Sequence, residues 1–204
     1  MSSYQKKIRI ARNGLLRIAA SLIAAIAAVY VMAVWTHVTA QTYTETEVKA
    51  AFIYKFTSFI EWPKESFPDK SSRFRIGILG DDPFGNVLDD TLKGKQAQDH
   101  AIELVRAKKC DDLLECEIVF ISPSEKDHYP EILDKFIARS ILTIGDSEGF
   151  AAMGGIINLV KVDNKIRFEV NLNAARKANL KISSQLLKIA PKIYDGDMPE
   201  KGRK

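Results

Sequence analysis

Between residues 44 and 146, the apolar positions alternate between a helical spacing and short continuous runs. The first helical pattern follows Thr44-x-x-Glu47, a capping box, so we expect a helix to begin there and to end at Trp62-Pro63. Apolar runs predict strands at 74–79, 101–105, 118–121 and 141–144, with further helices after Asp82-Pro83 and after Ser122-Pro123. Strands that alternate with helices favour a mainly parallel sheet covered by helices on both faces.

After residue 146 the pattern changes to two adjacent strands. The segments 156–162 and 166–172 are separated only by Asp163-Asn164-Lys165, which predicts an antiparallel hairpin. A last helix is expected at 182–189. The sequence therefore predicts a single α/β domain, with a mainly parallel sheet flanked by helices and a C-terminal antiparallel hairpin.

The first forty residues differ from the rest of the chain. Five basic residues without an acidic one precede an apolar run at 18–35, and Val38-Thr39-Ala40 supplies small residues before Gln41. This pattern is typical of a secretory leader, so we expect a signal peptide at 1–40 with cleavage between Ala40 and Gln41. The apolar run is also long enough to span a membrane, so an uncleaved anchor is the alternative. Both place the folded part outside the cytoplasm.

Cleavage of the leader changes the charge of the chain. The whole sequence has 30 basic and 26 acidic residues, whereas residues 41–204 have 25 and 26. The excess of positive charge thus belongs to the leader, and nucleic-acid binding is not expected. The remaining 164 residues suit one domain, with its core at about 45–190.

Two cysteines, Cys110 and Cys116, lie six positions apart in this exported segment. An even count and an oxidising compartment predict a disulfide between them, and free thiols are the alternative. A metal site is not expected, because His100 and His128 are the only histidines after the leader.

The sequence contains none of the usual catalytic motifs, so neither an enzyme nor a cofactor is expected. Three acidic residues, Asp81, Asp82 and Asp146, follow predicted parallel strands, whose carboxyl ends commonly bind ligands. They are the candidates for a small-ligand pocket. The alternative is that Asp82 caps a helix and that Asp81 and Asp146 are solvated turn residues.

Several motifs, in the same order, resemble the YfiR-like family of exported bacterial proteins. They are Val48 to Phe56 with Phe59 to Pro63, Ile78 to Gly85, Val119 to Ser122, Leu142 to Asp146 with Gly149-Phe150, Arg167 to Leu172, and Ile182 to Leu187. The resemblance implies a periplasmic, non-enzymatic domain that represses a membrane diguanylate cyclase by binding its periplasmic sensing domain. It also implies an outer-membrane lipoprotein that relieves the repression, and it leaves a homodimer open.

A repressor of this kind needs a binding surface, and the hairpin is the candidate. If Phe168, Val170 and Leu172 face the core, then Arg167, Glu169 and Asn171 face outward, and Ile157 adds an apolar element. The alternative is an ordinary solvated strand face. Two functions follow from the sequence: a binding regulator of a membrane protein, or a periplasmic small-ligand module that uses the acidic turns.

Overall fold

The computed structural model describes residues 22–23, 26, 43–69 and 71–196. The predicted cleavage point between Ala40 and Gln41 lies outside the described residues. The described residues 43–69 and 71–196 form one compact unit. Among the described residues, no helix combines the length and the apolar composition needed to cross a membrane.

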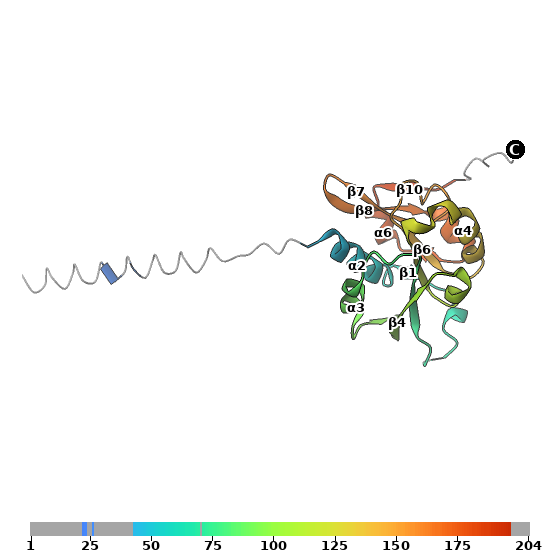
Figure 1. The fold of residues 1–204 in the computed structure, drawn as a ribbon, viewed down its shortest axis with the longest axis horizontal. Coiled ribbons are helices and arrows are strands. Elements are labelled where there is room, and N and C mark those ends of the chain that lie inside the picture. The colour runs from blue at the N-terminus through green and yellow to red at the C-terminus, as the bar shows by residue number, and fades with distance from the viewer. Residues whose placement is uncertain (1–21, 24–25, 27–42, 70, 197–204) are drawn as a thin grey trace, which may run out of the picture. The chain divides into compact units, whose positions relative to one another are not determined.

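An eight-stranded sheet runs through this unit in the order β10-β8-β7-β6-β5-β2-β4-β3 (Figure 1). Its five central strands are parallel neighbours: β4 (His100–Ala107), β2 (Phe74–Leu79), β5 (Ile118–Ile121), β6 (Leu142–Gly145) and β7 (Ile157–Val162). The remaining three lie at the two sides: β3 (Gln96–Ala97) antiparallel to β4, β8 (Lys165–Asn171) antiparallel to β7, and β10 (Lys192–Tyr194) parallel to β8. The predicted fold class is therefore confirmed.

The helices cover both faces of the sheet. They are α2 (Glu45–Phe56), α3 (Asn86–Leu92), α4 (Tyr129–Ile137), α5 (Leu172–Lys177) and α6 (Ser184–Ile189), with 3-10 turns η1 (Lys64–Ser66), η2 (Cys110–Leu113) and η3 (Pro123–His128). Central strands such as β5 are buried on both faces, because alternate residues enter two different apolar clusters. Phe120 packs in the cluster under α2, whereas Val119 and Ile121 pack in the cluster under α4.

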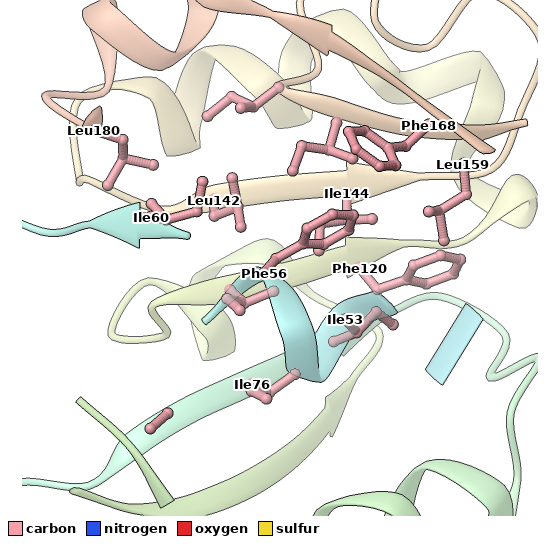
Figure 2. Close-up of a cluster of buried hydrophobic side chains, with 14 of the residues drawn as sticks. Ile53, Phe56, Ile60, Ile76, Phe120, Leu142, Ile144, Leu159, Phe168 and Leu180 are labelled. Carbon is pink, nitrogen blue, oxygen red and sulfur yellow. The ribbon is translucent and has the colours of Figure 1, made fainter. Parts of the chain in front are cut away.

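Helix α2 packs its buried side chains into the larger cluster (Figure 2). Its side chains Ile53 and Phe56 are fully buried against the sheet. The ring of Phe56 meets the ring of Phe168 edge to face, with the centroids 5.4 Å apart. Such a pair adds about 1 kcal/mol beyond the burial itself. The apolar side of α2 therefore fixes this helix on the sheet.

The capping box predicted for α2 is present. The Thr44 amide donates to Glu47 Oε2 at 2.6 Å, and the Glu47 amide donates to Thr44 Oγ1 at 3.2 Å. The predicted end of the helix is wrong, since α2 stops at Phe56 and not at Trp62-Pro63. The chain leaves the helix there because β1 (Ile60–Glu61) pairs antiparallel with β9 (Lys181–Ile182), a contact that local spacing does not reveal.

Candidate functional site

The three acidic residues predicted to form a pocket do not meet. Asp82 Oδ2 accepts a hydrogen bond from Arg106 Nε at 2.7 Å, and Asp81 pairs with Lys108, so both bind basic residues from the β4 side. Asp146 follows β6, and strand β5 lies between β6 and β2 in the sheet. Within the described residues, no group of three His, Cys, Asp or Glu side chains is arranged to hold a metal.

Asp82 also does not cap helix α3 as predicted. Its Oδ1 accepts a hydrogen bond from the Phe84 amide at 2.7 Å and so closes a short turn, and α3 begins only at Asn86. The carboxylate therefore organises the loop after β2 and is held by Arg106. This arrangement leaves Asp82 without a free oxygen directed at a ligand.

Asp146 is not the solvated turn residue of the alternative interpretation. Its side chain is 9% exposed and accepts a hydrogen bond from Lys49 Nζ at 2.9 Å. Burial alone would lower the pKa of Lys49, but hydrogen bonds to Glu45 and Asp146 outweigh it, and the net pKa is raised. Asp146 Oδ1 is buried and has no hydrogen-bond partner among the described residues. The ion pair between Lys49 and Asp146 thus connects the first turns of α2 to the end of β6.

Two residues of the predicted partner surface, Ile157 and Asn171, are buried. Asn171 is the N-cap of α5: its Oδ1 accepts from the Ala174 amide at 2.9 Å and its Nδ2 donates to the Ala151 carbonyl at 2.8 Å. The prediction that they lie on the surface is therefore wrong. Side chains along β8 alternate between the two faces as expected, but the segment around Ala151 covers the end of β8 at Asn171.

Glu169 is half-buried, because β8 is not the edge of the sheet. Strand β10 pairs with β8 from Glu169 to Asn171, and the Glu169 carboxylate accepts hydrogen bonds from Tyr194 Oη at 3.3 Å and Asn158 Nδ2 at 3.4 Å. Arg167 lies closer to the turn and is exposed, without an ion pair among the described residues. Of the four predicted partner residues, Arg167 alone is freely accessible.

The free end of the β7–β8 hairpin is the exposed part of this region (Figure 1). Val162 at the turn is 44% exposed, and Asp163 and Asn164 adopt positive φ angles of 48° and 58°, as a tight hairpin turn requires. Lys161 Nζ lies 3.1 Å from Glu45 Oε2, which brings the hairpin end beside the start of α2.

Helix α2 carries a shallow apolar groove of about 410 Å³. Tyr43, which is 65% exposed, stands at the beginning of the groove. Its remaining lining is Glu47, Val48, Ala51, Phe52, Lys55 and Thr91. We call this groove, together with Lys161, Val162, Lys165 and Arg167, the α2–hairpin surface.

Both cysteines are free thiols, and the predicted disulfide is wrong. The intervening residues do not form an open loop: they wind into η2, which inserts Leu113 into the core and leaves the two thiols beyond disulfide distance. Burial raises the pKa of Cys116 to about 12, and the adjacent Glu117 carboxylate adds to the effect. Burial also raises the pKa of Cys110. Neither environment activates a thiolate nucleophile.

Sequence inspection missed a polar pocket of about 450 Å³ at the amino-terminal ends of β2 and β5. Glu117, only 8% exposed, lines it and accepts a hydrogen bond from the Arg75 amide at its Oε2, at 2.5 Å. Burial raises the pKa of the Glu117 carboxyl to about 7, against the lowering effect of the Arg75 amide. We call this the Glu117 pocket. The sequence signal for this pocket was an acidic residue, Glu117, immediately before the wholly apolar strand 118–121.

Comparison with known proteins supports one assignment. Residues 46–191 match the model of the YfiR/HmsC-like family, so the chain belongs to that family. This family comprises periplasmic regulators of diguanylate cyclase signalling.

One of the solved structures shares the fold at low identity. A conserved domain protein from Vibrio cholerae O1 biovar El Tor is 11% identical, with a TM-score of 0.51 over 74% of this chain and 60% of that one. The chain thus spans less than two thirds of that protein. An ABC domain from Streptococcus pneumonia, solved with L-Trp, gives a TM-score of 0.42 at 10% identity over 58% of this chain and 54% of its own. No curated protein sequence gives a significant match.

Proposed function

We propose that this protein is a periplasmic, non-enzymatic regulator that binds the periplasmic sensing domain of a membrane diguanylate cyclase and holds its activity down. The observation that carries the proposal is the family match, which extends over 46–191, nearly the whole folded unit. The leader expected at 1–40 is consistent with export. An outer-membrane lipoprotein that relieves repression, and a second copy of this chain, are further partners suggested by the family resemblance.

The α2–hairpin surface is our candidate for the contact with the cyclase. Its apolar groove, with Tyr43 and Phe52, has the basic Lys161 of the hairpin end beside it, and the exposed Val162, Lys165 and Arg167 lie on the other face of the hairpin. An apolar centre with a charged rim is the usual composition of a protein–protein interface. The basic rim favours a partner surface that carries acidic side chains.

The acidic turns no longer support the small-ligand alternative, because Asp81, Asp82 and Asp146 each bind basic side chains of the domain itself. Glu169 is also a poor position for testing partner binding. A charge reversal there would disturb contacts with Asn158 and Tyr194 and so change the stability of the domain. Arg167 is the better position, since it has no ion pair to lose among the described residues.

A photo-crosslinking experiment tests the proposal. A photoreactive phenylalanine analogue is placed at Val162 in one variant and at the exposed Lys126 of η3 in a control variant. In intact cells we expect the Val162 position to crosslink to a membrane diguanylate cyclase, and Arg167→Glu in the same chain to reduce the yield. Equal crosslinking from both positions, or crosslinks only to proteins outside the membrane, would contradict the proposed surface and partner.

A further inference from the structure

The Glu117 pocket is lined by three arginines and three glutamates, and of these arginines only Arg75 forms an ion pair among the described residues. Arg75 is engaged within the domain: its Nη1 lies 2.5 Å from Glu115 Oε2 and its Nε lies 3.3 Å from Glu103 Oε2. Arg73 and Arg139 also line the pocket, and neither forms an ion pair or a side-chain hydrogen bond with another described residue. The pocket therefore presents two guanidinium groups that have no carboxylate of their own.

Two different chain segments carry these arginines, and both side chains are exposed at the pocket. Arg73 directly precedes β2, and Arg139 follows α4, where its amide bonds to the Phe136 carbonyl at 3.0 Å. Ser140, also in the lining, has a positive φ of 55° and turns the chain toward β6. Both arginines thus extend from chain segments that are anchored to the core.

We propose that the Glu117 pocket binds a small oxyanion, a phosphate or a carboxylate group, between the guanidinium groups of Arg73 and Arg139. Guanidinium groups donate paired hydrogen bonds that match both kinds of anion. The volume of about 450 Å³ lies within the usual range of small-molecule sites. The proposal is independent of the regulatory function, since it concerns a site on the opposite, amino-terminal edge of the central strands.

Glu117 makes this binding depend on pH. Its carboxyl lies in the same pocket, and an anion nearby favours the protonated, neutral form. Since burial already places the pKa of this carboxyl at about 7, anion binding will take up a proton near neutral pH. Anion affinity will therefore rise as the pH falls through 7.

Other charged groups also surround Glu117. Arg75 on β2 lowers the Glu117 pKa and Glu115 raises it, while Glu65 on η1 stands exposed at the rim. His100 also approaches the pocket: its Nδ1 lies 2.8 Å from the carbonyl oxygen of Ser72, a lining residue. A variant at Glu117 separates its contribution from that of His100.

Nuclear magnetic resonance titration of the full mature chain tests the proposal. Sulfate represents phosphate groups, because its charge is constant between pH 6 and pH 8, and acetate represents carboxylates. We expect saturable shifts at Arg73 and Arg139 with at least one of the two anions, and the tighter one identifies the class. Arg139→Gln and Arg73→Gln should each weaken binding at least tenfold, whereas Arg167→Gln, a matched exposed arginine on the hairpin, should not.

The pH dependence supplies the second readout. The wild-type affinity should be up to about tenfold higher at pH 6 than at pH 8, as expected for a carboxyl with a pKa of about 7 that must be protonated. Glu117→Gln should bind equally well at both pH values. No saturable shift with either anion, or shifts that persist unchanged in both arginine variants, would overturn the proposal.

Discussion

Glu117→Gln should make the domain more stable, and increasingly so as the pH rises. The carboxyl is 8% exposed, and burial raises its pKa from 4.5 to about 7. Between these two pH values the folded state holds a proton that the unfolded chain has released. The free energy of unfolding of the wild type therefore falls as the pH rises through this window.

The magnitude follows from the size of the shift. Each pKa unit corresponds to about 1.4 kcal/mol, so ionising Glu117 in the folded state costs roughly 3 kcal/mol in total. Glutamine has the shape of the protonated carboxyl, and its Oε1 retains an acceptor for the Arg75 amide. The variant should thus lead by about 1 kcal/mol at pH 5, where the unfolded carboxyl is already mostly ionised, and by about 3 kcal/mol at pH 8.

Urea unfolding at a series of pH values measures this difference. Trp62 is a suitable fluorescence probe, because its Nε1 donates to the Glu117 carbonyl at 3.2 Å. Glu115→Gln is the matched control: that side chain is 82% exposed, and its pH-dependent effect should stay below about 1 kcal/mol. A stability difference between wild type and Glu117→Gln that does not change from pH 5 to pH 8 would refute the reasoning.

Two further predictions concern Lys49 and the cysteines. Lys49→Ala leaves the nearly buried Asp146 carboxylate without its partner and should lower the free energy of unfolding in urea by about 2–4 kcal/mol. The control Lys161→Ala removes an exposed ion pair with Glu45 and should cost less than about 1 kcal/mol. Equal effects of the two variants would show that the Lys49–Asp146 contact is not buried. In the absence of reductant, a thiol reagent should modify only Cys110 in the native protein, and both Cys110 and Cys116 in urea. Fewer than two reactive thiols in urea would contradict the finding that both cysteines are free.

The sequence predicted the sheet well because its strands are recognisable locally. Continuous apolar runs such as 118–121 become doubly covered parallel strands, and the short polar turn at Asp163-Asn164 joins β7 to β8 as expected. By contrast, β10 is a three-residue strand that exists only through its pairing with β8. Its local sequence carries no strand pattern, so nothing in the sequence indicated that another strand pairs with the outer side of β8.

The partner surface and the Glu117 pocket were less predictable, because the exposure of a side chain depends on segments that are distant in the sequence. Asn171 does alternate with Val170 on the opposite face, as the strand period requires, yet the segment around Ala151 buries it. The cysteine spacing suggested a bridge, but η2 places Leu113 in the core and fixes both thiols apart. Glu117 was overlooked since a single acidic residue before a strand normally lies in solvent.

The central claim is that this protein restrains a membrane diguanylate cyclase, and the cellular concentration of cyclic-di-GMP tests it most directly. Deletion of the gene should raise that concentration and favour attachment over swimming. Expression of the wild-type chain should restore the original level, and the Val162→Glu, Arg167→Glu double variant should fold normally but fail to restore it. An unchanged cyclic-di-GMP concentration after deletion, in a strain shown to make the protein, would contradict the account.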